Sequence, residues 1–226
     1  IIGFDERSAT LHYHGKRGTW AAPGRTMLVD AGVSVRGYGS DITRTYTGEG
    51  CDPTFADLVS GMEALQKELA AAPRPGMKYL DLHVRAHVLI GDLLHRAGVL
   101  KVAGEAAVEK GLTRPFFPHG LGHFLGIQVH DVAGRFADRE GTLAPPPPEY
   151  PALRTTRTIE EGMLFTIEPG LYFIPMLLDE LRAGADRGLV DWALVDRLTP
   201  CGGIRVEDDV FVEADGVRNL TRPELP

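Results

Sequence analysis

The chain has 226 residues, which fits one ordinary domain, and its apolar share of 43% is typical of a globular protein. The formal net charge of −7 argues against non-specific binding to nucleic acid, because such binding needs a basic surface. No apolar run approaches the ~18 residues that a membrane-spanning helix needs. The two cysteines, Cys51 and Cys201, are too few for a disulfide scaffold, so we expect reduced thiols and a cytoplasmic location.

The first fifty residues are predicted to form strands and turns. Three segments combine alternation with β-branched or aromatic residues, as strands do: residues 9–14, 27–32 and 41–47. Residues 15–18 contain two glycines and are expected to break the chain after the first of these strands.

Two long helices are predicted next. Asp52 is a suitable N-cap and Pro53 a suitable first residue, and apolar residues then recur at three-and-four spacing until Pro73. A second helix is expected over about residues 79–97, with Gly98 as its stop signal. The side chains expected on the buried face of this second helix are Leu80, Val84, His87, Val88 and Leu94.

The second half of the chain begins with a stretch rich in glycine and histidine, residues 111–135. Four prolines at 145–148 indicate an extended surface loop. The other expected elements are a strand at 163–174 interrupted at 169–170, a helix at about 176–198, a final strand at 203–212 and a turn at 215–216. Strands, then two helices, then strands again indicate an α+β fold.

Five short segments place an acid or a histidine in an apolar strand or a glycine-rich stretch. These residues are Asp30, Asp41, His123, Glu168 and Glu207. Burying an ionised carboxylate is costly unless it is paired or bound to a metal, and four carboxylates together would repel one another. The set therefore indicates a pair of divalent ions. Each residue alone is more often an ordinary turn, strand-end or loop residue, so the prediction depends on all five.

The type of donor atom limits the metal. Four carboxylates and one imidazole form a mostly hard, oxygen-rich set, which favours Mn²⁺, with Co²⁺, Zn²⁺ or Fe²⁺ as alternatives. Five side chains can serve two ions only if some carboxylates bridge them. Bridging holds two ions roughly 3.5–4 Å apart and converts a water between them into hydroxide near neutral pH.

Strand periodicity predicts which of the acids share a face. Asp30 and Asp41 lie on consecutive predicted strands joined by a glycine-containing turn, so we expect them to be cross-strand neighbours. On the last strand, Arg205 and Glu207 are two residues apart and share a face, whereas Asp208 should point away. This periodicity favours Glu207 over Asp208 as the metal ligand.

These motifs resemble the catalytic domain of the pita-bread metallopeptidases, which include methionine aminopeptidase, aminopeptidase P and prolidase. Prolidase, the Xaa-Pro dipeptidase, is the most similar of these. The resemblance covers essentially the whole chain and is carried by residues 118–126, 129–131, 153–155, 166–174 and 202–208. It implies a curved antiparallel sheet covered by helices.

The resemblance also implies a role for each of the five residues. Asp30 would chelate one ion, and Asp41 and Glu207 would bridge both. His123 and Glu168 would complete the shell of the other ion. Glu168 would in addition accept a proton from the bridging water.

Five further residues match family positions around the metal site. His130 resembles the histidine that steadies the tetrahedral intermediate, and His119 one that lines the same pocket. His12 resembles a histidine on the substrate side, and Arg154 the prolidase arginine that holds the substrate carboxylate. Arg205 is a candidate for substrate binding, although neutralising the carboxylates is slightly favoured as its role.

The function implied is hydrolysis of Xaa-Pro dipeptides by a hydroxide that bridges two metal ions. An Xaa-Pro bond has no N–H, and a metal site needs none. An arginine that binds the substrate carboxylate would restrict the substrate to dipeptides. Three alternatives stay open: removal of the first residue from longer Xaa-Pro peptides, as in aminopeptidase P, hydrolysis of phosphotriesters by the same hydroxide, and a non-catalytic binding module.

The start of the chain differs from the family pattern. The chain opens on Ile1 rather than Met, and its first residues are typical of the middle of a domain. The family's catalytic domain begins with helices upstream of this point, and prolidases have a further N-terminal domain. We therefore expect residues 1–226 to be a catalytic domain that lacks these parts. The expected partners are a small peptide substrate and, in the full-length protein, a second copy, with no nucleic acid and no membrane.

Overall fold

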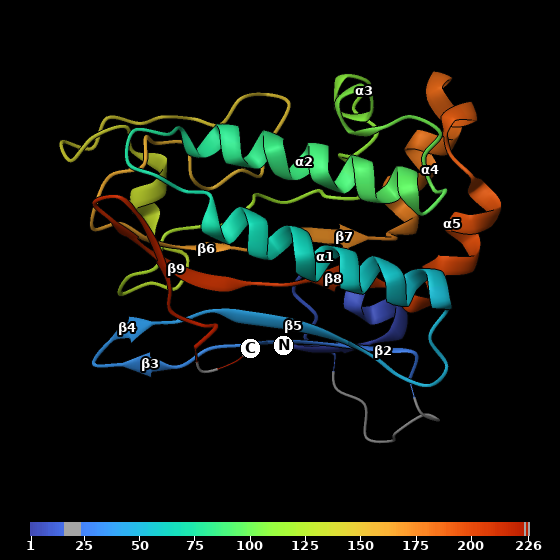
Figure 1. Ribbon diagram of the computed structural model, residues 1–226, viewed down its shortest axis with the longest axis horizontal. Helices are drawn as coiled ribbons and strands as arrows, with labels where there is room; N and C mark the ends of the chain where they lie inside the picture. The colour runs from blue at the N-terminus through green and yellow to red at the C-terminus, as the bar shows by residue number, and fades with distance from the viewer. Residues whose placement is uncertain (16–23, 224, 226) are drawn as a thin grey trace.

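Two long helices pack against antiparallel strands in the computed structural model, which describes residues 1–15, 24–223 and 225 (Figure 1). Helices α1 (Pro53–Ala71) and α2 (Tyr79–Arg96) lie side by side along the same side of the strands. The N-terminal strands lie on the side of α1 that is away from α2 (Figure 1). The prediction of an α+β architecture, with antiparallel strands covered by helices, is confirmed.

The strands described are β1 (Ile2–Phe4), β2 (Thr26–Ala31), β3 (Ser34–Val35), β4 (Tyr38–Gly39), β5 (Ile42–Thr47), β6 (Leu164–Ile167), β7 (Gly170–Tyr172), β8 (Gly203–Arg205), β9 (Asp208–Glu213) and β10 (Gly216–Asn219). They pair in the orders β1-β2-β5, β10-β9-β6, β3-β4 and β7-β8, and each of these pairs is antiparallel. A β-bridge between Thr43 and Glu207 joins the first group to the C-terminal strands. The hydroxyl of Thr45 also accepts from the backbone N–H of Arg205 and donates to its carbonyl. Segments about 160 residues apart in the chain are thereby brought together.

Helix α1 begins and buries its apolar face as the sequence predicts. The Asp52 carboxylate accepts a hydrogen bond from the backbone N–H of Thr54 at 2.8 Å, which satisfies one of the free N–H groups of the first turn. Of the apolar residues that recur along this helix, Phe55, Leu58, Met62, Leu65 and Leu69 are buried, whereas Val59 is half-buried. The buried side chains among these belong to the main hydrophobic core, which lies between the two helices and the strands.

Helix α2 has the predicted bounds, but the predicted buried face was partly wrong. Gly98 follows the helix at a φ of +80°, a conformation that favours glycine. His87 and Leu94 are buried as expected, whereas Leu80, Val84 and Val88 are half-buried. The fully buried positions include Leu82, His83, Ala86 and Ile90. The face differs because α2 is enclosed both by α1 and by the segment that follows α3, so its buried stripe is wide.

The strand predicted at residues 9–14 was wrong. The chain forms a 3-10 helix, η1 (Asp5–Ala9), and then a turn. The hydroxyl of Ser8 donates to the Asp5 carbonyl at 2.7 Å and accepts from the backbone N–H of Gly203 at 2.7 Å. Such local side-chain bonds compete with strand pairing. Residues 16–18 of the predicted break at 15–18 lie outside the described residues.

The helix predicted at about 176–198 is divided into three pieces: α4 (Pro175–Ala183), the 3-10 helix η3 (Ala185–Leu189) and α5 (Trp192–Leu198). Gly184 ends α4, and Asp191 starts α5 by accepting from the backbone N–H of Leu194 at 2.9 Å. The glycine and the second capping residue therefore override the apolar pattern. The other helices described are α3 (Gly104–Glu109), η2 (Val132–Arg135) and η4 (Thr199–Cys201).

The strand predicted at 203–212 is interrupted at Val206 and Glu207. Its first part, β8, pairs with β7, and its second part, β9, pairs with β6. The strand predicted at 163–174 is interrupted at Glu168 and Pro169, one residue earlier than expected. Both interruptions lie at the same place in the fold because the two segments pair with each other on either side of them. Within the described part of the chain, no helix is both long enough and apolar enough to cross a membrane.

Candidate metal centre

The five predicted metal ligands come from five separate segments whose ends meet at one cavity. Asp30 is near the end of β2, Asp41 directly precedes β5, Glu168 directly follows β6, and Glu207 lies at the break between β8 and β9. His123 is in the glycine-rich segment before η2. All five line a cavity of about 320 Å³. The same cavity is lined by five other residues of the predicted site: His12, His119, His130, Arg154 and Arg205.

His123 is at the centre of the acidic side chains. Its Nδ1 lies 3.1 Å from the Phe124 carbonyl oxygen, which makes Nδ1 the protonated nitrogen of the neutral ring. Its Nε2 lies 3.6 Å from Asp41 Oδ2, 3.7 Å from Glu168 Oε1 and 3.8 Å from Glu207 Oε1. Burial lowers the pKa of His123, but the contact with Asp41 and the charge of Glu168 outweigh this and leave the pKa raised. One imidazole nitrogen and three carboxylate oxygens thus face a common point.

Burial raises the pKa of two of the proposed ligands, Glu207 and Glu168. Glu207 is 2% exposed, and its Oε2 accepts a hydrogen bond from the hydroxyl of Thr43 at 2.7 Å. Its Oε1 has no hydrogen-bond partner among the described residues. Burial, followed by the charges of Glu168 and Asp41, raises the pKa of Glu207 well above its ordinary value. Burial likewise raises the pKa of Glu168 to about 6.

An orphaned carboxylate oxygen at this point tests whether the residues fit a divalent cation. The described residues supply no donor for Glu207 Oε1, and a buried oxygen without a partner is unfavourable. The ligand atoms of His123, Glu168 and Glu207 all lie within 4.8 Å of one another. The same is true of the ligand atoms of Asp41, His123 and His130. The donor set and its spacing fit divalent metal ions.

Asp41 is held by a residue that the sequence did not single out. Its backbone N–H donates to both carboxylate oxygens of Asp209 at 3.3 Å. Burial raises the pKa of Asp41, but contact with His123 outweighs it and leaves the pKa lowered. Burial raises the pKa of Asp209 to about 7. Asp209 has the same strand parity as Glu207, which is the signal that could have identified it.

Asp208 points away from the cavity, as strand parity predicts. It is fully buried and makes salt bridges to Arg44 at 2.8 Å and to Arg222 at 2.7 Å. These contacts lower the pKa of Asp208 despite its burial, which by itself would raise it. Arg44 also donates to the backbone carbonyl of Glu207 at 2.8 Å. The ion pair of Asp208 and Arg44 therefore holds the backbone at the break between β8 and β9.

Asp30 is bound to Arg205 rather than placed in the tight group of ligand atoms. Arg205 Nη2 donates to Asp30 Oδ2 at 2.5 Å, and its Nε donates to the hydroxyl of Thr43 at 3.2 Å. The expectation that Asp30 and Asp41 are direct cross-strand neighbours was wrong. The residue opposite Asp30 is Thr43, and Asp41 is the diagonal neighbour, because the hairpin β3-β4 separates β2 from β5.

A chain of hydrogen bonds connects Arg205 to His119. Arg205 Nη1 donates to the hydroxyl of Tyr172 at 3.1 Å, and this hydroxyl lies 2.9 Å from His119 Nε2. His119 Nδ1 donates to the Gly120 carbonyl at 2.8 Å, so Nε2 is the acceptor for Tyr172. Burial, reinforced by the charge of Arg205, lowers the pKa of His119 to about 3 and keeps the ring neutral. Sequence reasoning missed both Tyr172 and Thr43, although Thr43 shares the strand parity of Asp41.

The remaining predicted residues lie on the more open side of the cavity. The ring of His130 is 4.3 Å from that of His123, centroid to centroid, and 6.3 Å from that of His12. Burial and the neighbouring His123 and Arg154 lower the pKa of His130 to about 4. Arg154 lines the cavity and is half-buried. This side therefore contains two imidazoles and one guanidinium, whereas the deep side contains the carboxylates.

Residues 1–214 match the model of metallopeptidase family M24. The chain belongs to this family. It is 52% identical over 223 residues to a protein named Xaa-Pro dipeptidase from Marinobacter nauticus and 46% identical to one of the same name from Stenotrophomonas maltophilia. These alignments cover 98% and 99% of the chain but 50% of each relative. The chain thus spans about half the length of the curated relatives it matches.

Solved structures of aminopeptidase P from Escherichia coli are similar to this chain as well. The zinc-substituted enzyme in complex with product has a TM-score of 0.75 at 28% identity and matches 99% of this chain and 43% of its own. The structure with the inhibitor Pro-Leu has a TM-score of 0.73 at 26% identity and matches 99% of this chain and 44% of its own. The chain therefore has the pita-bread fold that the sequence motifs predict.

Proposed function

We propose that the cavity hydrolyses Xaa-Pro dipeptides with the help of two divalent metal ions. The observation that carries this proposal is the convergence of four carboxylates and His123 in one cavity that also contains Arg154. Family M24 membership and the names of the relatives from Marinobacter nauticus and Stenotrophomonas maltophilia support it. Because the chain spans half of those relatives, the activity is proposed for this chain from its own site.

The proposed metal ligands divide between the two ions. Asp30 would bind one ion, His123 and Glu168 would bind the other, and Asp41 and Glu207 would be shared between them. The ions would lower the pKa of a bound water and polarise the scissile carbonyl. Glu207 is the carboxylate best suited to bridge the two ions. Its Oε2 is oriented by the hydroxyl of Thr43, and its Oε1 has no hydrogen-bond partner among the described residues.

Glu168 is the proposed proton acceptor. A carboxylate beside the metal-bound water can accept a proton from that water and pass it to the leaving amine. His119 Nδ1 lies 4.0 Å from Glu168 Oε2 and its ring is held by Tyr172 and Gly120, so it confines the carboxylate in one orientation. His130 is placed beside His123, where a neutral imidazole can donate to the oxyanion of the tetrahedral intermediate.

Substrate selection is assigned to the open side of the cavity. A dipeptide has its carboxylate one residue beyond the scissile bond, and the Arg154 guanidinium is the proposed partner for that carboxylate. His12 lies close to His130 and would contact the same end of the substrate. Arg205 is 5% exposed, and its nitrogens bond Asp30, Thr43 and Tyr172. We therefore assign Arg205 to neutralising the carboxylates rather than to gripping the substrate.

The test compares hydrolysis of Met-Pro with that of Met-Pro-Ala by the purified protein loaded with Mn²⁺, before and after chelation. We expect the dipeptide to be cleaved faster and activity to disappear on chelation. Arg154→Gln should raise KM for Met-Pro by about tenfold or more, since a charged hydrogen bond is lost. Arg139→Gln is the matched control, because Arg139 is far more exposed and does not line the cavity.

The outcome also separates the alternatives. Faster cleavage of Met-Pro-Ala would favour an aminopeptidase P-type activity, for which the similarity to the Escherichia coli structures is the supporting observation. Hydrolysis of neither peptide, with metal bound, would favour a non-catalytic binding module. Undiminished activity after complete removal of metal would contradict the two-metal mechanism.

The proposal also includes the identity of the metal, the cellular location and the oligomeric state. The oxygen-rich donor set supports Mn²⁺ as the metal. Two free cysteines, Cys51 and Cys201, support a reducing, cytoplasmic location. The resemblance to prolidases supports a homodimer, in which this chain acts as the catalytic domain of a longer protein.

A further inference from the structure

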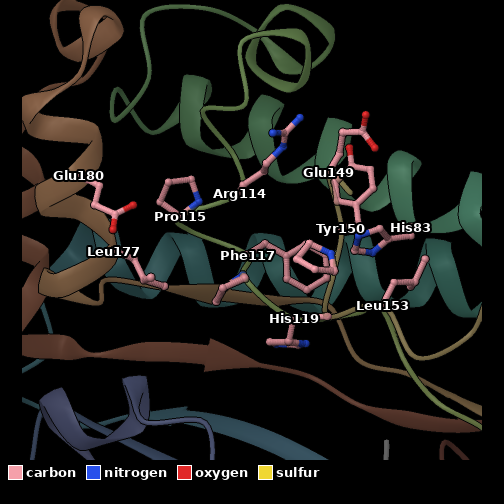
Figure 2. Close-up of a pocket in the computed structure, with 13 residues that line it drawn as sticks. His83, Arg114, Pro115, Phe117, His119, Glu149, Tyr150, Leu153, Leu177 and Glu180 are labelled. Atoms are coloured by element: carbon pink, nitrogen blue, oxygen red, sulfur yellow. The ribbon is translucent and has the colours of Figure 1, made fainter. Parts of the chain in front are cut away.

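A second pocket lies directly behind the wall of the metal cavity (Figure 2). Its volume is about 260 Å³, and it shares Pro118, His119 and Ala152 with the metal cavity. We call it the Tyr150 pocket, after the aromatic ring at its centre. None of the metal ligands predicted from the sequence lines it. It is therefore a neighbouring space rather than part of the candidate metal centre.

The floor of the Tyr150 pocket is aromatic and uncharged. The ring of His83 packs edge-on against that of Tyr150, with centroids 4.6 Å apart, and Phe117 lies 5.5 Å from His83 and 5.0 Å from His119. Burial lowers the pKa of His83 to about 3, so this imidazole is neutral. Its Nδ1 is buried and has no hydrogen-bond partner in the described part of the chain. The floor offers stacking surface and no fixed charge.

The mouth of the pocket, in contrast, contains one cation and two anions. These are Arg114, Glu149 from the segment after the proline run, and Glu180 from α4 (Figure 2). All three are exposed, and none of them has an ion-pair partner within the described residues. The guanidinium of Arg114 lies 5.7 Å from the centre of the Tyr150 ring. Charges of both signs therefore border an apolar floor.

This combination limits the ligand class. A cavity of about 260 Å³ is below the roughly 300–1,000 Å³ of sites for drug-sized ligands, so the ligand is small. A ligand with one charge would leave the opposite charges of the mouth unused, whereas a zwitterion matches both. Arginine pairs well with a carboxylate, and a glutamate pairs with an ammonium group. An aromatic floor suits an apolar side chain or ring.

We propose that the Tyr150 pocket binds a free zwitterionic α-amino acid, with its carboxylate on Arg114 and its ammonium group on Glu149 or Glu180. The side chain lies on the floor formed by Phe117 and Tyr150. Amino acids of this kind are the products of dipeptide hydrolysis, so the pocket is a product site next to the place of release. The link to products rests on the proposed function, whereas the binding itself does not.

His119 gives the pocket a physical connection to the metal cavity. One side of its ring contacts Phe117, and its Nε2 accepts from Tyr172, which in turn accepts from Arg205, the partner of Asp30. A ligand that lies against Phe117 restricts the ring that packs on His119, and thereby the positions open to His119, Tyr172 and Arg205. Occupation of the pocket is therefore expected to reduce kcat. The two sites share one wall, and a ligand in either site favours one arrangement of the side chains in that wall.

Binding is tested on the metal-free protein by calorimetric titration with L-proline and L-leucine, so that no turnover is needed. Pyrrolidine and propionate, which each have only one of the two charges, serve as ligand controls. Arg114→Gln and the double replacement Glu149→Gln with Glu180→Gln should each weaken amino-acid binding by about tenfold or more, since each removes a charged hydrogen bond. Arg154→Gln, in the metal cavity, and Arg139→Gln, on the open surface, should leave the affinity unchanged.

The outcomes decide between a second site and the metal cavity. Loss of binding in Arg154→Gln, with no change in Arg114→Gln, would place the amino acid in the metal cavity and overturn the proposal. Equal affinity for propionate and L-leucine would overturn the zwitterionic class, and absence of binding at millimolar concentration would overturn the site. These results do not depend on whether the protein hydrolyses peptides.

The connection to turnover has its own measurement in the metal-loaded protein with Met-Pro as substrate. L-leucine should lower kcat as well as raise KM in the unchanged protein, and Arg114→Gln should abolish the effect on kcat while the effect on KM persists. An effect on KM alone in the unchanged protein would contradict coupling through His119. If Met-Pro is not hydrolysed at all, the proposed function fails, and the calorimetric result still decides whether the pocket binds amino acids.

Discussion

Two clusters of buried ionisable side chains lie on either side of His119, and burial affects them in opposite ways. On one side, burial raises the pKa of Glu168 to about 6 and that of Glu207 well above its ordinary value. On the other side, burial lowers the pKa of His83 to about 3 and that of His87 to about 2. A medium of low polarity disfavours the charged form of each group, whichever sign that charge has.

The two clusters differ in what they need from outside the protein. Neutral imidazoles do not repel one another, and His87 Nδ1 lies 2.9 Å from the hydroxyl of Thr113. Each cluster has buried atoms without a hydrogen-bond partner among the described residues: Glu207 Oε1 in the first, and His83 Nδ1 and His87 Nε2 in the second. The acidic cluster therefore needs cations to offset the repulsion of its carboxylates, whereas the histidine cluster carries no charge that has to be offset. Three experiments test this contrast between the two clusters.

Replacing Glu207 by Gln has the largest expected effect. The amide keeps the size of the side chain but removes a bridging carboxylate, so turnover should fall by about a thousandfold or more, equivalent to several kcal/mol. Stabilisation by added Mn²⁺ should disappear as well. Without metal, however, Glu207→Gln should melt at a higher temperature than the unchanged protein at about pH 8, because it removes the cost of a buried charge.

Glu213→Gln provides the control for this experiment. Glu213 lies on the same strand, β9, and pairs with Arg218 at 3.2 Å near the surface. Its replacement should change neither turnover nor the response to metal. A lower melting temperature of metal-free Glu207→Gln would show that the carboxylate stabilises the fold without a cation, and the contrast between the clusters would fail.

The pH dependence of metal binding has the next largest effect. In the metal-free protein, Glu168 has its pKa raised from 4.5 to about 6 and Asp209 from 3.8 to about 7, both mainly by burial. Between the ordinary and the raised pKa, the folded state binds more protons than the unfolded state. These groups therefore stabilise the folded state at pH values below their ordinary pKa. This stabilising contribution is lost as the pH rises through the pKa values that the two groups have in the folded state.

Metal must displace the proton of its ligand Glu168, so the stabilising effect of the metal should grow as the pH rises through about 6. Each proton displaced raises the apparent metal affinity about tenfold per pH unit. Thermal melts with and without Mn²⁺ at about pH 5.5 and about pH 7.5 measure the difference, which should be larger at the higher pH. Equal stabilisation at both values would mean that the carboxylates are already ionised without a cation.

Replacing His83 by Phe has the smallest expected effect. The pKa of His83 is lowered by burial to about 3 from an ordinary 6.5, so its contribution to stability is lost as the pH falls below 6.5. Each pH unit in this window costs about 1.4 kcal/mol for one such imidazole. At about pH 4.5, His83→Phe should therefore retain about 3 kcal/mol of unfolding free energy that the unchanged protein loses between pH 6.5 and that value.

Urea unfolding at about pH 4.5 and about pH 7 measures this quantity for the variant and the unchanged protein. His95→Gln serves as the control, because His95 is on the same helix but exposed. The same dependence on pH in His83→Phe and the unchanged protein would show that the imidazole is charged in the folded state. Metal binding should be unaffected by either replacement.

Much of the fold follows from local sequence signals, and the exceptions have local causes too. The cap at Asp52, the periodicity of α1 and the stop at Gly98 correctly predict two helices. The strand predicted at 9–14 fails because the Ser8 hydroxyl bonds the chain at Asp5 and at Gly203, which is distant in sequence. A pattern of alternating residues cannot reveal a partner that lies nearly two hundred residues away.

The sequence by itself determined the chemistry of the acidic cluster. Four carboxylates and one histidine in apolar or glycine-rich settings indicate cations wherever they meet, since buried like charges repel. Strand parity was enough to choose Glu207 over Asp208, because side chains alternate along a strand. The family motifs added residues on the open side of the cavity, including Arg154 and His130.

Only the tertiary structure decided which neighbours support these residues. The hydroxyl of Thr43 orients Glu207, the Asp209 carboxylate holds Asp41, and Tyr172 connects His119 to Arg205. Each of these contacts joins segments that are far apart in the chain, so no local pattern encodes it. The Tyr150 pocket is of the same kind, because its mouth and floor come from four segments that meet only when the chain is folded.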